Sequence, residues 1–149
     1  MESLDKLDLA IIRELQMDAR LTITDLSARV GLSKTPCQIR MKRLEEQNYI
    51  RGYVALVNQK KLGIKQVAFV QVKLSDTRTK ALEAFNSAVR LVPEIEQCHM
   101  MAANFDYLLK VRTSDMDMFR KVLGEKISSL PHVSQTSTFM VMEDVKDPV

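Results

Sequence analysis

Residues 22–46, TITDLSARVGLSKTPCQIRMKRLEE, predict two short helices joined by a tight turn. Thr22 has an aspartate three residues later, which is the spacing of a capping box at a helix start. Gly31 suits the left-handed residue just beyond a helix end, and Ser33 is a good N-cap for the next helix. Pro36 falls in the first turn of that helix, where its missing N–H costs no hydrogen bond. We therefore expect a helix, a short turn and a second helix.

The exposed side of this second helix is predicted to be basic. Cys37, Met41 and Leu44 recur at helical spacing and form its apolar stripe, so we expect the other side chains to point outward. No acidic residue lies between Ser33 and Leu44. Residues 29–65 hold nine Lys and Arg but two Asp and Glu, a net charge of +7 in a chain whose total is +3. Such a block favours a polyanionic partner, although a solvated lysine-rich face has the same composition.

Two helices joined by a glycine turn, the second basic on its exposed side, are typical of a helix-turn-helix, whose second helix enters the major groove of DNA. Gln and Arg can make paired hydrogen bonds to base edges, while Lys, Ser and Thr can hold phosphates. The expected partner is double-stranded DNA. The predicted DNA contacts are Ser33, Lys34, Thr35, Gln38, Ile39, Arg40, Lys42 and Arg43.

A helix is predicted ahead of this unit and a strand after it. Apolar residues at helical spacing predict a helix over residues 4–17, with Asp5 and Asp8 in its first turn, where the helix dipole favours acids. Residues 50–57 are rich in β-forming side chains and predict a strand, which the polar hinge 58–63 follows. We expect a helix-turn-helix, winged-helix-like DNA-binding domain at residues 1–52, a strand and hinge linker at 53–64, and a second domain at 65–149.

The second domain alternates between strand and helix patterns. Apolar residues at helical spacing predict one helix from about Arg78 to Pro93 and another capped by Ser114, which buries Met116 and ends near Pro131. The strands are expected at residues 67–74, 95–102, 107–112 and 133–142.

The resulting order, βαββαβ, predicts a ferredoxin-like sandwich with two helices on one side of a four-stranded antiparallel sheet, so the whole chain is α+β. The other side of that sheet would be bare, with apolar residues such as Phe69, Met101, Leu109 and Phe139 exposed on it. A second subunit is the expected cover, which makes the protein a homodimer. Two-fold symmetry would in turn match a pseudo-palindromic operator.

Several classes of protein are not expected from this composition. No apolar run approaches the roughly 18 residues that cross a bilayer, and the acidic N-terminal residues do not resemble a secretory leader, so a cytoplasmic location without membrane binding is expected. Cys98 and His99 are adjacent on a predicted strand and point to opposite sides, so we expect no metal site. His99 and Asp106 lack a nucleophile or phosphate loop beside them, so we expect neither an enzyme nor a cofactor.

Residues 4–58 resemble the N-terminal domain of the leucine-responsive and asparagine-operon regulators, the Lrp/AsnC or feast/famine family. The most specific matches are LSKTPCQIRMKRLE at residues 32–45, FDYLLKV at 105–111 and TSTFMVMEDVK at 136–146. The resemblance extends over essentially the whole chain, because the second domain of that family is also βαββαβ. It implies a transcription regulator that is dimeric, often assembled into octamers, and responsive to an amino acid or similar metabolite.

The resemblance also implies a recognition helix at residues 34–46 and an effector loop at residues 102–107. Asp106 and Tyr107 fit the family pattern of that loop, whereas Ala103 stands where glycine is usual. A methyl group there either blocks the approach of a ligand to the backbone or requires a negative φ. The effector-binding residues implied are His99, Met101, Ala102, Ala103, Asn104, Asp106, Tyr107, Thr136 and Ser137.

A rival hypothesis remains from the residues alone. The chain could be a metabolite-binding or assembly module of ferredoxin-like fold that does not act on DNA, with its N-terminal helices serving protein contacts. DNA binding by residues 1–60 and calorimetry with a panel of amino acids separate the two hypotheses.

Overall fold

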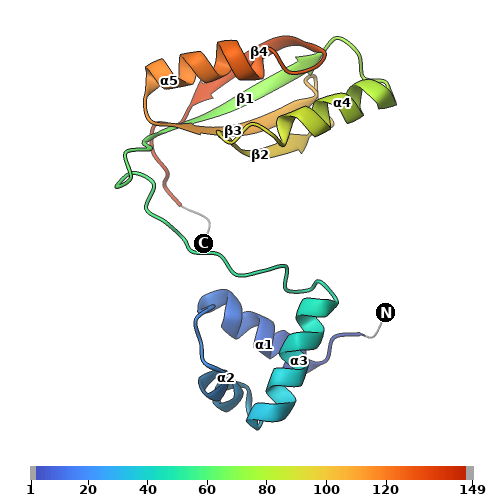
Figure 1. Cartoon of the computed structure of the whole chain (residues 1–149), viewed down its shortest axis with the longest axis vertical. Coiled ribbons are helices and arrows are strands. Elements are labelled where there is room, and N and C mark those ends of the chain that lie inside the picture. Colours follow the sequence, from blue (N-terminus) through green and yellow to red (C-terminus); the bar gives the residue numbers. More distant parts are fainter. Residues whose placement is uncertain (1–2, 147–149) are drawn as a thin grey trace. The chain divides into compact units, whose positions relative to one another are not determined.

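The structure is a computed structural model that describes residues 3–146, and the chain divides into two units between Ala55 and Leu56 (Figure 1). The first unit holds three helices. Asp5 begins the first of them by accepting hydrogen bonds from two backbone N–H groups, and Thr22 caps the second in the way predicted. Gly31 ends the second helix in the left-handed conformation, with φ of 74°. The helices are α1 (Lys6–Met17), α2 (Ile23–Val30) and α3 (Lys34–Glu46).

One cluster of buried side chains holds the three helices together. Cys37 and Leu44 of α3 are fully buried, and Met41 packs beside them, which confirms the predicted apolar stripe. They meet Ile11 of α1 and Leu26 of α2, both fully buried. The side of α3 that carries this stripe therefore faces α1 and α2, and the opposite side faces solvent.

The strand predicted at residues 50–57 is not formed. The segment has no strand assignment, and Val54 and Leu56 in it are 82% and 68% exposed. A strand needs a neighbour that accepts and donates its backbone hydrogen bonds, and the described residues place none beside this segment. High β propensity alone was therefore an insufficient basis for the prediction.

The second unit has the predicted βαββαβ order, with sheet order β2-β3-β1-β4 and every neighbouring pair antiparallel. Figure 1 shows both helices of this unit on the same side of the sheet. This arrangement confirms the ferredoxin-like prediction. The elements are β1 (Gln66–Leu74), α4 (Thr79–Val89), β2 (Ile95–Met100), β3 (Tyr107–Thr113), α5 (Met116–Lys121), which continues as the π-helical turn η1 (Val122–Ile127), and β4 (Val133–Met140).

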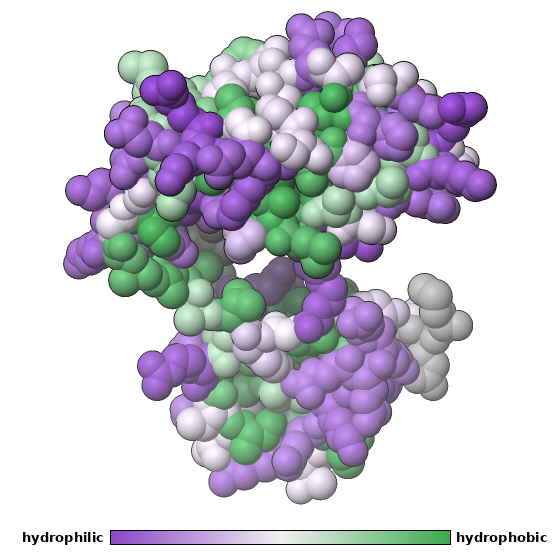
Figure 2. All heavy atoms as spheres, turned by 45° about the horizontal axis from the view of Figure 1, so that its top comes forward, coloured by the Kyte–Doolittle hydropathy of each residue, from purple (hydrophilic) through white to green (hydrophobic). Residues whose placement is uncertain are grey.

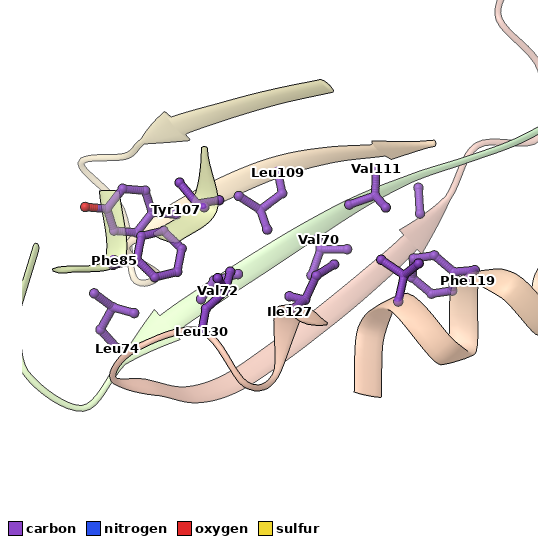
Figure 3. Close-up of a cluster of buried hydrophobic side chains, with 13 residues drawn as sticks. Val70, Val72, Leu74, Phe85, Tyr107, Leu109, Val111, Phe119, Ile127 and Leu130 are labelled. Atoms are coloured by element: carbon purple, nitrogen blue, oxygen red, sulfur yellow. The ribbon is translucent and has the colours of Figure 1, made fainter. Parts of the chain in front are cut away.

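The core of this unit lies between the sheet and its helices (Figure 3). Alternate residues of the two central strands, β1 and β3, point into this core. Val70 and Leu109 are register partners on these strands, and both are fully buried. They pack with Phe85 of α4 and Phe119 of α5. Leu109 was expected on the bare side of the sheet, and that prediction is wrong because the alternation along β3 runs the other way.

The start of α5 also differs from the prediction. Asp115, not Ser114, is the N-cap, and its Oδ1 accepts a hydrogen bond of 2.8 Å from the N–H of Met118. Met116 is 47% exposed instead of buried. Phe119 and Ile127 are buried as expected, so the helix faces the sheet as predicted, and Met116 is its first residue, at the exposed end.

The side of the sheet away from the helices, which we call the open face, carries alternate residues of all four strands. Phe69 of β1 is the register partner of Phe139 on β4 and of Lys110 on β3. Phe139 is 54% exposed. Glu96 lies within 2.5 Å of Arg112 Nε and 3.6 Å of Lys110 Nζ, so the charges on this face are partly paired. The open face is thus a mixed apolar and charged surface.

Candidate nucleic-acid interface and ligand-binding region

The turn between α2 and α3 sets the position of α3. Gly31 provides the left-handed backbone, and the N–H of Leu32 donates to the carbonyl of Ser27 at 2.9 Å. Ser33 is the N-cap of α3, but its side chain makes no capping hydrogen bond. Ser33 is exposed at the solvent end of the turn. The geometry is that of a helix-turn-helix, with the start of α3 accessible.

The solvent side of α3 carries polar, cationic and apolar side chains together. Ile39 is 64% exposed in the middle of the helix. Lys42 lies 3.7 Å from Glu46, and because both side chains are largely exposed this pair holds the lysine only weakly. Hydrophilic side chains gather on the part of the N-terminal unit where α3 lies, in the lower half of Figure 2. The exposed members of the predicted DNA-contact set are Ser33, Lys34, Thr35, Gln38, Ile39 and Lys42.

Arg40 and Arg43 do not point outward, which corrects the prediction for these two residues. Arg40 Nη1 lies 2.8 Å from Asp8 Oδ1 and 2.6 Å from Asp5 Oδ2, and Arg43 Nη2 lies 2.6 Å from Asp8 Oδ2. Cys37, Arg40 and Arg43 are spaced three apart, so both arginines flank the buried stripe of α3. Their guanidinium groups therefore reach the first turn of α1, and both side chains are only partly exposed.

Hydrogen bonds in this network shift the pKa values of Asp5 and Arg40. Backbone hydrogen bonds at the start of α1, and then the guanidinium of Arg40, lower the pKa of Asp5 below its ordinary value. The carboxylate of Asp5 raises the pKa of Arg40 in return. Asp5 and Arg40 therefore both remain charged at neutral pH, and the ion pair between them persists there.

Asp106 and Tyr107, which the family pattern placed in an effector loop, are held by contacts inside the domain. Asp106 Oδ2 accepts a hydrogen bond of 2.7 Å from the N–H of Leu74, and the N–H of Asp106 donates to the carbonyl of Val72 at 2.9 Å. Tyr107 is 1% exposed, and its hydroxyl donates to Asn86 Oδ1 at 2.7 Å. Burial raises the pKa of the Tyr107 hydroxyl. Both side chains therefore support the fold of the β2–β3 turn.

The other residues of that set lie on different sides of the sheet. His99 is in register with Leu108 on the open face, and Ser137 is in register with Gln71 on the same face. Two strands separate His99 from Ser137, a distance of about 14 Å at ordinary strand spacing. Thr136 is in register with Val72, on the side of the helices. Apart from Asp106, which is bound to Leu74 in the turn, the set divides into three groups: His99 and Ser137 on the open face, Tyr107 and Thr136 on the helix side, and the exposed turn residues Met101, Ala102, Ala103 and Asn104.

Comparisons with known proteins agree with this geometry. Residues 4–51 match a winged helix-turn-helix DNA-binding model, and residues 67–149 match the Lrp/AsnC ligand binding domain. The chain belongs to the Lrp/AsnC family.

Relatives of the chain within the Lrp/AsnC family include named regulators. It is 60% identical to the proline dehydrogenase transcriptional activator of Rhizobium radiobacter, over 98% of this chain and 94% of that protein. It is 46% identical to the leucine-responsive regulatory protein of Escherichia coli, over 97% of this chain and 88% of that protein.

Solved structures of similar proteins share the fold. A transcriptional regulator of Neisseria meningitidis in complex with L-Met has a TM-score of 0.91 and 33% identity, covering 97% of this chain and 94% of that chain. An AsnC family transcriptional regulator of Agrobacterium tumefaciens has a TM-score of 0.90 and the same identity and coverage.

The alanine that replaces the usual glycine of the Lrp/AsnC loop fits the backbone. Among residues 3–146, Asn48 and His132 are the non-glycine residues with positive φ, so Ala103 adopts a backbone open to any residue. The loop therefore keeps an unstrained conformation with alanine. The remaining effect of the substitution is the space that its methyl group takes.

A cavity of about 350 Å³ lies beside the turn, between α4 and the edge strand β2. Asn86 of α4 and Arg90, the residue that caps the end of α4, line one side, and Cys98 and Tyr107 line the other. Burial raises the pKa of the Cys98 thiol. No sequence motif pointed to Asn86 or Arg90, because the cavity depends on how α4 packs against the sheet.

Within the described range no three His, Cys, Asp or Glu residues lie together as a metal site would need. The helices in that range are also too short or too polar to cross a membrane.

Proposed function

We propose that this protein is a transcription regulator that binds double-stranded DNA through the exposed side of α3 and has no catalytic role. The observation that carries the proposal is the solvent side of α3, where Lys34, Thr35, Gln38 and Lys42 follow a helix-turn-helix turn. Family membership and the naming of relatives as transcriptional regulators support it. Because its proposed target is chromosomal DNA, the proposal includes a cytoplasmic location.

Each exposed side chain of α3 has a contact that its chemistry allows. The Gln38 amide can bond an adenine edge, and the apolar Ile39 suits a thymine methyl group. Ser33, Lys34, Thr35 and Lys42 suit phosphate oxygens. Arg40 and Arg43 belong to the predicted set as well, but both are paired with Asp8, which restricts their reach toward DNA.

We propose that the protein acts as a homodimer, with octamers formed from dimers. The open face exposes Phe139 and part of Phe69, a surface that a second copy would cover. The unpaired apolar segment at residues 50–57 adds further surface of the same kind. Two α3 helices related by a two-fold axis would then read the half-sites of a pseudo-palindromic operator, about 34–36 Å apart.

We also propose an amino acid as effector of the second unit. The match to a ligand binding domain and the relative solved with L-Met support this proposal. The exposed turn residues Met101, Ala102, Ala103 and Asn104 are the members of the implied set that a ligand can reach directly. Asp106 and Tyr107 would shape the turn, and His99 would contribute from β2, whereas Thr136 and Ser137 lie on β4 at the opposite edge of the sheet.

One experiment tests both parts. The purified chain selects fragments from genomic DNA in the presence and in the absence of a mixture of the twenty amino acids. We expect a few fragments to be enriched, with their yield changed by the mixture, because effector and DNA binding are coupled through one protein. Enrichment of no fragment would refute the DNA-binding function and favour a metabolite-binding module, and an unchanged yield would refute the effector.

A further inference from the structure

We propose that Asp8 is a positioning residue of the DNA-binding unit. Its carboxylate holds Arg40 and Arg43 on the α1 side of α3, so that Gln38, and neither arginine, reads a base. The inference deepens the proposed function, because it assigns the reading of the operator to one side chain. It rests on three features of the described residues: the contacts of Asp8, its burial, and the positions of the three side chains around α3.

The contacts of Asp8 form a closed network. Asp8 Oδ1 accepts from Arg40, and Asp8 Oδ2 accepts from Arg43 and from the N–H of Asp5. Asp5 Oδ1 caps α1, and Asp5 Oδ2 accepts from Arg40. All four carboxylate oxygens are therefore engaged, and the first turn of α1 is tied to the middle of α3 across 32 residues of sequence.

Burial makes this network hard to open. The side chain of Asp8 is 1% exposed, whereas that of Arg40 is 26% exposed. An arginine that moved to a base edge would leave a buried carboxylate short of a partner, which is strongly unfavourable. A contact between Arg40 and DNA would have to offset that loss.

The geometry of α3 places the two arginines and Gln38 on opposite flanks of the buried stripe. With about 100° per residue, Arg40 lies about 50° and Arg43 about 110° from the centre of the stripe formed by Cys37 and Leu44, both on the flank that faces α1. Gln38 lies about 110° from that centre on the other flank, and it is exposed. Because arginine typically reads guanine and glutamine reads adenine, the base preference that depends on α3 should be for adenine at the position facing Gln38.

The test uses the full chain and a duplex that the wild-type protein selects from a random-sequence library. Dissociation constants are measured for every single-base variant of that duplex with Gln38→Ala, Arg40→Ala, Asp8→Asn and the matched control Glu14→Gln. Glu14 forms an ion pair with Arg29 in which both side chains are more than one-third exposed, so its loss is expected to change nothing.

We expect Gln38→Ala to reduce the preference for one adenine by at least about fivefold. Arg40→Ala should weaken all duplexes by a common factor and leave their ranking intact. Asp8→Asn should blur the same adenine preference, because the ion pairs of Arg40 and Arg43 with Asp8 are lost and only the pair of Arg40 with Asp5 still joins α3 to α1. A residue that only stabilised the fold would lower the active fraction without changing that preference.

A guanine preference that disappears in Arg40→Ala, or an unchanged profile in Gln38→Ala, would overturn the inference. An unchanged profile in folded Asp8→Asn would overturn the positioning role. If Asp8→Asn prevents folding, the Gln38 and Arg40 variants still show which side chain reads the base. If the wild-type chain enriches no sequence, the proposed function itself fails.

Discussion

Replacing Asp106 with alanine should destabilise the second unit, because this carboxylate supports the β2–β3 turn from within. Asp106 Oδ2 accepts from the N–H of Leu74 at 2.7 Å, and Leu74 is 5% exposed. Water cannot easily replace the lost acceptor at such a site. A hydrogen bond to a charged group contributes about 1.5–3 kcal/mol, so we expect a loss of about 2 kcal/mol in the free energy of unfolding.

The assay is thermal unfolding of the full chain, with the transition of the second unit followed by near-UV circular dichroism. For a unit of this size, 2 kcal/mol corresponds to a fall of about 8–16 °C in Tm. Asp106→Asn keeps a carbonyl acceptor and should recover much of the loss. Asn104→Ala is the matched control, since that exposed residue of the same turn should change stability by less than about 0.5 kcal/mol. A Tm of Asp106→Ala equal to that of the wild type would refute the structural role.

Three further predictions follow from other parts of the molecule. Leu44→Ala should lower the free energy of unfolding of the N-terminal unit by about 2–5 kcal/mol in urea, because Leu44 is fully buried. Ile39→Ala, at a side chain that is 64% exposed, should lower it by less than about 0.5 kcal/mol, and equal effects would contradict the assigned faces of α3. Phe139→Asp should shift the protein toward monomer in analytical ultracentrifugation, with Met142→Asp as the control, and an unchanged mass would contradict dimerisation through the open face. The hydrogen bonds of Arg78 lower the pKa of Asp76 to about 2, so Asp76 should stay ionised and paired with Arg78 until the pH falls toward that value. An NMR titration in which Arg78→Ala leaves the pKa of Asp76 unchanged would contradict this cause.

Much of the fold was predictable because its signals are local. Thr22 caps a helix through a hydrogen bond to a residue three positions away, and Gly31 ends the same helix through its own φ. The stripe of Cys37 and Leu44 and the strand and helix periodicities of the second unit likewise require only short stretches of sequence. Local signals of this kind determine which elements form.

The errors concern features that depend on distant residues. Arg40 and Arg43 were expected to face solvent, but their partner Asp8 lies more than thirty residues earlier in the chain. The strand expected at residues 50–57 has β propensity without a neighbouring strand. Leu109 was assigned to the wrong side of the sheet, because alternation shows that a strand has two sides but not which one the helices cover.

The candidate effector residues illustrate the same difference. The family pattern found Asp106 and Tyr107 by their positions in a loop, but it gave no information on their hydrogen bonds to Leu74 and Asn86. Those bonds join residues that lie 32 and 21 positions apart. A motif can therefore mark a loop correctly while its side chains serve the fold of that loop.

The central claim, that the exposed side of α3 binds DNA, is tested most directly by the salt dependence of binding. The dissociation constant for a selected duplex is measured at salt concentrations from roughly 50 to 200 mM and at constant pH. The two proteins compared are the wild type and the double variant that carries both Lys34→Ala and Lys42→Ala. The account predicts weaker binding by the double variant and a slope of log K against log salt that is smaller by about 2 for each bound protomer. Equal slopes and equal affinities for the two proteins would contradict it.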